Sequence, residues 1–123
     1  MNAKDLAETL KLHKKWLWGE KEGIRADLSE ANLSEADLSR ADLNGADIDY
    51  AAWPLWCNSL NAQIDDRIAR QLLYHTLAAI DNSIYVSNNL KQTLLTEINV
   101  CAANGFHRAN ECGRLKPFQA DMK

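Results

Sequence analysis

The chain has 123 residues, of which 46% are apolar and 25% charged, and a formal net charge of −3. This composition excludes an intrinsically disordered chain and is typical of one small domain that folds alone. No apolar run reaches the roughly 20 residues of a membrane span, and the first residues lack the apolar core of a signal peptide, so a cytoplasmic protein without membrane contact is expected. An odd number of cysteines, three, argues against a disulfide framework.

The first predicted element is an amphipathic helix within residues 1–20. Asn2, followed three residues later by Asp5, resembles a capping box. Apolar residues and one histidine then recur at helical spacing before Gly19: Leu6, Leu10, His13 and Leu17. We expect this helix to cap the segment that follows it, with His13 as a core or boundary histidine and not a catalytic base.

Residues 26–50, here called the repeat segment, consist of five-residue words: Ala, then Asp or Asn, then Leu or Ile, then two variable residues. The third position of the words holds Leu28, Leu33, Leu38, Leu43 and Ile48. A period of five gives no single apolar face on a helix and alternates between faces on a flat strand. A backbone that turns a corner after each word resolves both conflicts. The Ala and the third residue then point inward, and the other positions face water.

These words are similar to the A(D/N)LXX repeats of the pentapeptide-repeat family, and residues 51–55 extend them weakly, with Trp53 in the central slot. The resemblance implies a right-handed quadrilateral β-helix in which four words complete one coil. The chain has words for about one to one and a half coils, and a single coil has little to stack on. The expected fold class is therefore α+β, a short β-helix capped and packed by α-helices. Segments such as "LHKKWL" and "FHRANECG" also resemble short prophage-borne members of the family.

Helices are predicted again after a loop around Pro54. The first runs from about Ile64 to Ile80. Ser87 caps the next, which stops at Asn104 and whose apolar stripe is Leu90, Leu94, Ile98 and Cys101. The expected organisation is a single domain, 1–123, made of a capping helix (1–20), the repeat coil (21–56), a helical part (57–105) and an irregular tail (106–123).

Charge is concentrated in the repeat segment. It holds seven acids against Arg40 alone, a formal charge of −6, whereas both flanks are weakly positive. Outward carboxylates can imitate a phosphate backbone and fill a basic groove, since contacts to phosphates carry little sequence information. The predicted binding residues on this acidic face are Asp27, Glu30, Glu35, Asp37, Asp42 and Asp47. The alternative is that the acids give only solubility and edge protection, and that the aspartates turn corners by bonding to the backbone.

The sequence thus predicts a non-enzymatic interaction protein without cofactor or metal. It would bind a protein with a basic groove, as a monomer or homodimer, and would not contact nucleic acid directly. Some longer pentapeptide-repeat proteins resemble DNA and block topoisomerases. The resemblance therefore implies a prophage-encoded inhibitor of a DNA- or RNA-handling protein in the bacterial host cytoplasm, of the anti-CRISPR or anti-restriction type.

The alternative function is a structural or oligomerising module that binds through helices or through Trp53 and Trp56, since tryptophans are frequent at interfaces. For these tryptophans we favour packing into the open end of the coil. Catalytic and metal sites are not predicted. Cys101, His107 and Cys112 lack the two-residue pairs that usually clamp zinc, and Cys112 with His107 has no activating context for nucleophilic catalysis.

Overall fold

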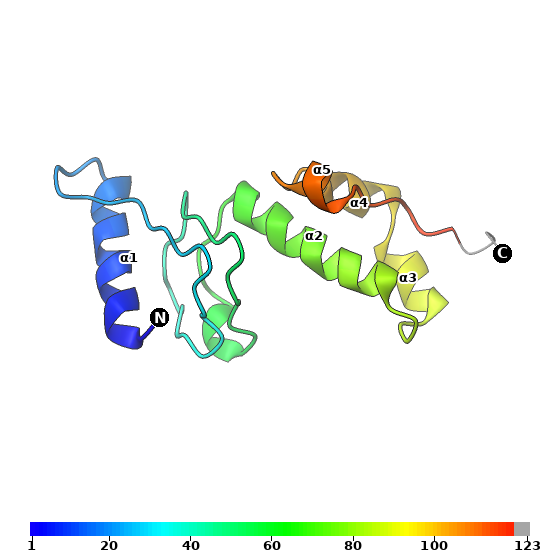
Figure 1. Cartoon of the computed structure of the whole chain (residues 1–123), viewed down its shortest axis with the longest axis horizontal. Helices are drawn as coiled ribbons and strands as arrows, with labels where there is room; N and C mark the ends of the chain where they lie inside the picture. The colour runs from blue at the N-terminus through cyan, green and yellow to red at the C-terminus, as the bar shows by residue number, and fades with distance from the viewer. Residues whose placement is uncertain (120–123) are drawn as a thin grey trace. The chain divides into compact units, whose positions relative to one another are not determined.

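The computed structural model describes residues 1–119, and Figure 1 shows its elements. In chain order they are α1 (Ala3–Leu17), the 3-10 helix η1 (Cys57–Ser59), α2 (Asp66–Asn82), α3 (Asn88–Leu94), α4 (Glu97–Ala103) and α5 (Ala109–Cys112). The chain divides into two compact units, Met1–Asp65 and Asp66–Lys123. Within residues 1–119, no helix combines the length and apolar character that crossing a bilayer requires.

α1 begins where the sequence predicts. Its N-cap is Asn2, whose side-chain oxygen accepts the backbone N–H of Asp5 at 2.8 Å. This bond satisfies one of the N–H groups that the start of a helix leaves unpaired. Lys14 and Lys15 lie in the last turn, where the partial negative charge of the helix C-terminus favours cations.

The repeat segment winds so that the chain returns beside its own start after four words. Parallel bridges pair Asp27 with Asp47 and Asn32 with Ala52. The third-position residues fill the interior, and none is more than 5% exposed: Leu28, Leu33, Leu38, Leu43 and Ile48. Their predicted inward orientation is confirmed.

The predicted β-helix, and with it the α+β class, is wrong. Residues 1–119 contain no β-strand and no sheet, and their regular structure is helical. A word contributes at most one bridged residue before the backbone turns, the word of residues 36–40 contributes none, and single pairs do not make a ladder. With little more than one coil, a bridged residue also has a partner on one side only. What remains are three isolated bridges, Asp27 to Asp47, Asn32 to Ala52 and Asp42 to Gln63.

His13 joins α1 to the repeat segment and is fully buried, as expected for a core or boundary histidine. Its Nδ1 accepts the backbone N–H of Ala26 at 2.9 Å, and its Nε2 lies 2.8 Å from the carbonyl oxygen of Asn44. Because Nδ1 supplies a lone pair, Nε2 carries the proton and donates it to Asn44. The N–H of Ile24 adds a bond to the Leu12 carbonyl at 3.0 Å, so the C-terminal half of α1 is fixed by hydrogen bonds.

The second unit buries one apolar cluster, consisting of Tyr74, Leu77, Leu95, Val100, Ala103, Phe106 and Ala109. α2 occupies nearly the range predicted for it and contributes Tyr74 and Leu77. As predicted, Ser87 caps α3, accepting the N–H of Leu90 at 3.1 Å.

The long helix predicted from Ser87 to Asn104 is wrong, because the chain breaks into α3 and α4. Thr96 starts α4 by accepting the N–H of Asn99 at 3.2 Å. Because the second helix starts anew at Thr96, the residues that face the core differ from those that a continuous helix would bury. Ile98 is 81% exposed and Cys101 is exposed, against expectation, while Leu95, Val100 and Ala103 are buried.

The tail predicted to be irregular contains a short helix. α5 lies within it, and Phe106 and Ala109 belong to the buried cluster. Phe118 is partly buried against the same cluster, and its N–H donates to the Leu95 carbonyl at 3.0 Å. The last part of the predicted tail, residues 120–123, lies outside the described residues.

Candidate interaction site

Each word of the repeat segment turns through the side chain of its second residue. In all five words this side-chain oxygen accepts the backbone N–H of the residue two positions later, at 2.9–3.1 Å; the pairs are Asp27–Ser29, Asn32–Ser34, Asp37–Ser39, Asp42–Asn44 and Asp47–Asp49. In the first three words the serine hydroxyl donates to the same oxygen. These Asx turns give the aspartates the structural role that the alternative interpretation assigned to them.

The last residue of most words has a left-handed backbone. Glu30, Arg40 and Tyr50 have φ of 62°, 61° and 63°, and Gly45 has φ of 82°. The carbonyl of each third residue accepts the N–H of the next alanine, as in Leu28 with Ala31 at 3.1 Å, so these corners are type II turns. Glu35 is the exception, because its φ is not positive. A non-glycine residue in this conformation carries strain of about 1–2 kcal/mol.

The predicted acidic residues are mostly exposed but do not share one face. Asp27, Glu30, Glu35, Asp37 and Asp42 are exposed, and Asp47 is half-buried. The bridges place only Asp27 and Asp47 in one row, since Asp42 pairs with Gln63. Successive words turn successive corners. The carboxylates are therefore distributed over several sides of the coil instead of forming a single ladder.

The hydrogen bonds of the turns also lower the pKa of two of these carboxylates. The Ser29 hydroxyl, helped by the Ser29 backbone N–H, holds the pKa of Asp27 below its ordinary value. The Ser39 hydroxyl and N–H lower the pKa of Asp37 in the same way. Hydrogen bonds to the ionised form favour it, so both groups stay negative well into the acidic range.

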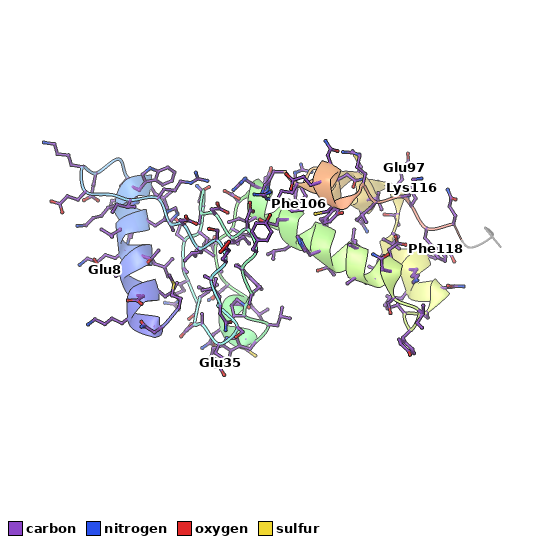
Figure 2. All side chains as sticks on the ribbon, viewed as in Figure 1. Glu8, Glu35, Glu97, Phe106, Lys116 and Phe118 are labelled. Atoms are coloured by element: carbon purple, nitrogen blue, oxygen red, sulfur yellow. The ribbon has the colours of Figure 1, made fainter. Side chains whose placement is uncertain are left out.

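Glu30 and Glu35 differ from the aspartates. Neither carboxylate makes a hydrogen bond or an ion pair with another residue in the described range 1–119, and the side chains of both are exposed. Figure 2 labels Glu35 at the edge of the repeat segment and Glu8 on the far side of α1. Because no intramolecular bond to either carboxylate would have to break, Glu30 and Glu35 can form an ion pair with a partner without disturbing the fold.

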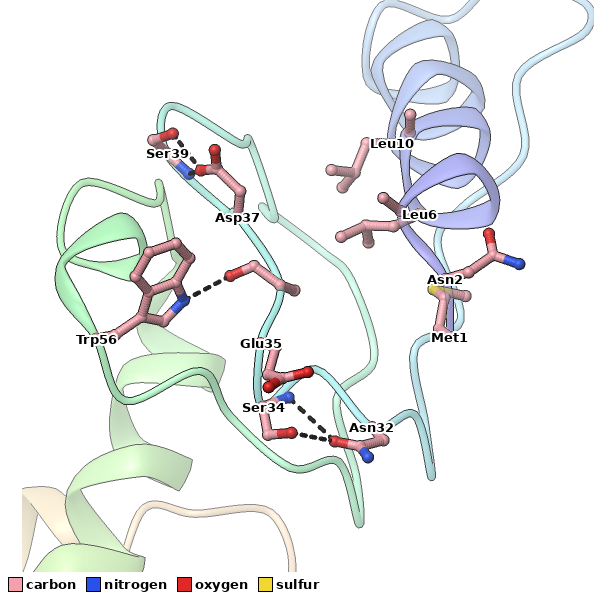
Figure 3. A pocket seen from close by; sticks show the side chains of 13 residues that line it. Met1, Asn2, Leu6, Leu10, Asn32, Ser34, Glu35, Asp37, Ser39 and Trp56 are labelled. Carbon is pink, nitrogen blue, oxygen red and sulfur yellow. Dashed lines mark hydrogen bonds between the residues drawn. The ribbon is translucent and has the colours of Figure 1, made fainter.

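A cleft of about 680 Å³ lies between α1 and the repeat segment (Figure 3). Leu6 and Leu10 point into it from α1, and Glu35 and Asp37 lie on the opposite wall. The indole N–H of Trp56, also on the wall, donates to the Ala36 carbonyl at 2.9 Å. Sequence reasoning missed this cleft, although it had selected Glu35, Asp37 and Trp56 individually.

The tryptophans do not form the expected buried plug. Trp53 is half-buried, Trp56 is 46% exposed and Trp18 is 72% exposed. Trp18 lies under the Lys14 ammonium, 5.4 Å from the ring centre, and Trp16 stacks on His13 with ring centroids 5.5 Å apart. Large apolar side chains are exposed nearby instead, among them Leu55 at 90% and Leu60 at 82%.

The candidate thiol and metal residues lie apart from this region in the sequence. Cys101, His107 and Cys112 are exposed. Among residues 1–119, no group of three or more His, Cys, Asp or Glu side chains is arranged to hold a metal ion. The repeat segment and its cleft are therefore the part of the described chain where candidate binding residues gather.

Residues 24–52 match the model of the family described as Pentapeptide repeats (8 copies). The match covers the whole repeat segment and about a quarter of the chain. Pentapeptide repeats are protein-interaction modules, and their family is generally non-enzymatic. The match ends before the second unit begins. No curated protein and no solved structure was found to match the chain.

Proposed function

We propose that the chain is a non-enzymatic binding protein whose repeat segment docks, through its carboxylates, into a basic groove of a nucleic-acid-handling protein. The observation that carries the proposal is the division of the repeat segment, of formal charge −6, into a buried column of leucines and carboxylates that are mostly exposed, with Asp49 buried and Asp47 half-buried. The interaction character of the matched family supports a protein partner.

The distribution of charge indicates the kind of groove. Asp27, Asp37 and Asp42 belong to words that face different sides of the coil, so a flat basic surface would meet only part of the charge. A groove that encloses the coil would meet more of it. Grooves of this kind hold nucleic acid mainly through its phosphates, where charge density matters more than chemical identity.

A protein that fills such a groove would act as an inhibitor. We extend the proposal to a phage- or prophage-encoded inhibitor of a DNA- or RNA-handling host complex, of the anti-CRISPR or anti-restriction type. The small size of the coil favours a short groove as the contact, in preference to the extended site that the long rod of a topoisomerase inhibitor would fill.

The test is capture of partners from a bacterial lysate by the full chain at low and high ionic strength. Exposed charge pairs are screened by salt, so captured partners should be released as salt rises. The double variant Glu30→Lys with Glu35→Lys should abolish capture with the fold intact, because neither carboxylate has an intramolecular partner. The matched control is Glu8→Lys with Glu20→Lys, which changes the net charge equally outside the repeat segment and should retain capture.

Salt-resistant capture would contradict the proposal, as would equal loss in the two double variants. A second candidate function would then apply: binding through apolar side chains. The exposure of Leu55, Leu60 and Tyr50, at 90%, 82% and 71%, favours this candidate within the first unit. In that case Leu55→Ser with Leu60→Ser should abolish capture while reversal of the glutamates leaves it unchanged.

A further inference from the structure

We infer that the cleft between α1 and the repeat segment binds a linear segment of the partner protein. That segment would place an aliphatic side chain against Leu10 and a lysine or arginine against Glu35. The inference rests on the proposed function for the basic character of the partner, and adds a defined site at which one part of it is recognised.

The apolar wall of the cleft follows from the way α1 is attached. The bonds of His13 to Ala26 and Asn44 fix the C-terminal half of the helix to the repeat segment. The cleft opens beside the N-terminal half, where Leu6 and Leu10 are one helical turn apart and point toward it (Figure 3). Leu6 is itself only 5% exposed, so Leu10, which is half-buried, is the side chain that an aliphatic group of the partner would cover, and burial of apolar surface there is favourable.

The opposite wall supplies charge complementarity. Glu35 and Asp37 both line it, and none of the residues that line the cleft is a lysine or arginine. Asp37 is held in its Asx turn by the N–H and hydroxyl of Ser39, whereas Glu35 makes no bond within the described chain. An incoming cation would therefore pair with Glu35 without breaking an existing interaction.

The size of the cleft selects a short segment. At about 680 Å³ it lies in the range of roughly 300–1,000 Å³ typical of sites that enclose a small ligand. Such a volume accommodates a few side chains of an extended or helical peptide. The ring of Trp56, 46% exposed at the same wall, adds an aromatic face on which a guanidinium can stack.

The experiment uses random short peptides displayed in a library and selected on the immobilised full chain. Selected peptides should combine Lys or Arg with Leu, Ile or Met. Binding is then followed by NMR through the indole N–H resonance of Trp56, which lies in the cleft and is assigned by its loss in Trp56→Phe. The resonance should shift on addition of a selected peptide and not on addition of the same peptide with its aliphatic residues changed to serine.

Three variants locate the site. Glu35→Lys should weaken peptide binding about fivefold or more, because a paired charge is replaced by a repulsive one. Ala7→Arg places a cation in the cleft at an exposed helix position and should weaken it similarly without unfolding the chain. Glu8→Lys makes the same charge change as Glu35→Lys at an exposed position of α1 that does not line the cleft, and should leave affinity within about twofold.

Equal loss of peptide affinity in Glu8→Lys and Glu35→Lys would overturn the inference, because it would show that only general charge attraction holds the peptide. The inference would also be overturned if the selected peptides bound Ala7→Arg with unchanged affinity, or if the selection yielded no sequence that combines basic and aliphatic residues. The proposed function fails by a different result, salt-resistant capture of partners from lysate. The two failures are therefore distinguishable.

Discussion

The two compact units of the chain bury their interiors by different means. In Met1–Asp65, a column of leucines is enclosed by a backbone that turns after every word, and the turns are made by Asp and Asn side chains bonded to backbone N–H groups. In Asp66–Lys123, helices pack their apolar faces together, and side-chain bonds to the backbone start helices, as Ser87 and Thr96 do.

This difference separates two classes of acid within the repeat segment. The aspartates at the second position accept hydrogen bonds in turns, so replacing them with a residue that cannot accept these bonds alters the fold as well as the surface. Glu30 and Glu35 occupy the last position of their words and make no such bond within the described residues. In the first unit, therefore, the glutamates are the acidic positions where binding can be altered without loss of structure.

The largest expected effect comes from emptying the leucine column. Leu38 is fully buried, and Leu38→Ala should lower the free energy of unfolding of the first unit by about 2–5 kcal/mol. All four tryptophans of the chain, Trp16, Trp18, Trp53 and Trp56, lie in this unit, so their fluorescence during denaturation in urea reports on it directly.

The matched control is Leu77→Ala, which removes a buried leucine, 2% exposed, from the cluster of the second unit. Most of the described helix lies in α2 to α5, so far-ultraviolet circular dichroism should register this variant more strongly than tryptophan fluorescence does. An unchanged tryptophan transition in Leu38→Ala would show that the leucines are not the interior of the first unit.

A somewhat smaller effect is expected at His13. His13→Ala leaves the Ala26 N–H and the Asn44 carbonyl without their partner in a buried place, which should cost about 2–4 kcal/mol in the first unit. Tyr74→Phe offers the comparison in the second unit. It removes a hydroxyl that donates to the Gly113 carbonyl and should cost about 1 kcal/mol. Equal costs in urea denaturation would contradict a special role for His13.

Acid should weaken the first unit through its turns. The folded pKa of Asp27 and of Asp37 is lowered from 3.8, so the stability these groups contribute is present above 3.8 and is lost as pH falls through the lower folded values. Urea denaturation followed by tryptophan fluorescence at a series of pH values should show this loss.

The control for the acid effect is Asp27→Asn with Asp37→Asn. Asn32 already makes the same turn with an amide oxygen, accepting the Ser34 N–H at 3.1 Å, so the fold should survive. The loss of stability below pH 3.8 should shrink in this variant. An undiminished loss would mean that other groups cause it.

The smallest effect concerns the left-handed corners. Arg40 has φ of 61°, and glycine there would relieve strain of about 1–2 kcal/mol while adding about 0.5–1 kcal/mol of chain entropy to the unfolded state. Arg40→Gly should therefore stabilise the first unit by roughly 0.5 kcal/mol. Glu35→Gly, at the corner without a positive φ, should destabilise it by a similar amount. If both variants changed the free energy of unfolding in the same direction, the distinction between corners with and without a positive φ would be contradicted.

The interior of the repeat segment was predictable because it depends on local spacing. A period of five is incompatible with a helix or a flat strand, and this is enough to place Leu28 and Leu33 inside. The β class was not predictable from the words themselves. It requires consecutive bridged pairs on neighbouring coils, and a segment of about one coil does not supply them.

Two further features were not predicted: the break between α3 and α4, whose sequence signal was overlooked, and the cleft, which has none. Thr96 followed by Glu97 is a helix start, but the apolar stripe through Leu94 and Ile98 outweighed it, and Cys101 was placed inside as a consequence. The cleft had no sequence signal. Its presence depends on bonds that His13 makes to residues far along the chain, and these set where the N-terminal half of α1 lies.

Amide hydrogen exchange across the repeat segment tests most directly whether it winds around its leucines. The N–H groups of Leu38 and Leu43 donate to carbonyls on the returning chain, at Asn58 and Gln63, with lengths of 2.9 and 2.8 Å. The N–H groups of Asp37 and Asp42 make no hydrogen bond within the described residues. We expect slow exchange at the leucines and fast exchange at the aspartates just before them. Fast exchange at the leucines, or slow exchange at Asp37 and Asp42, would contradict the wound segment and the acidic exterior that depends on it.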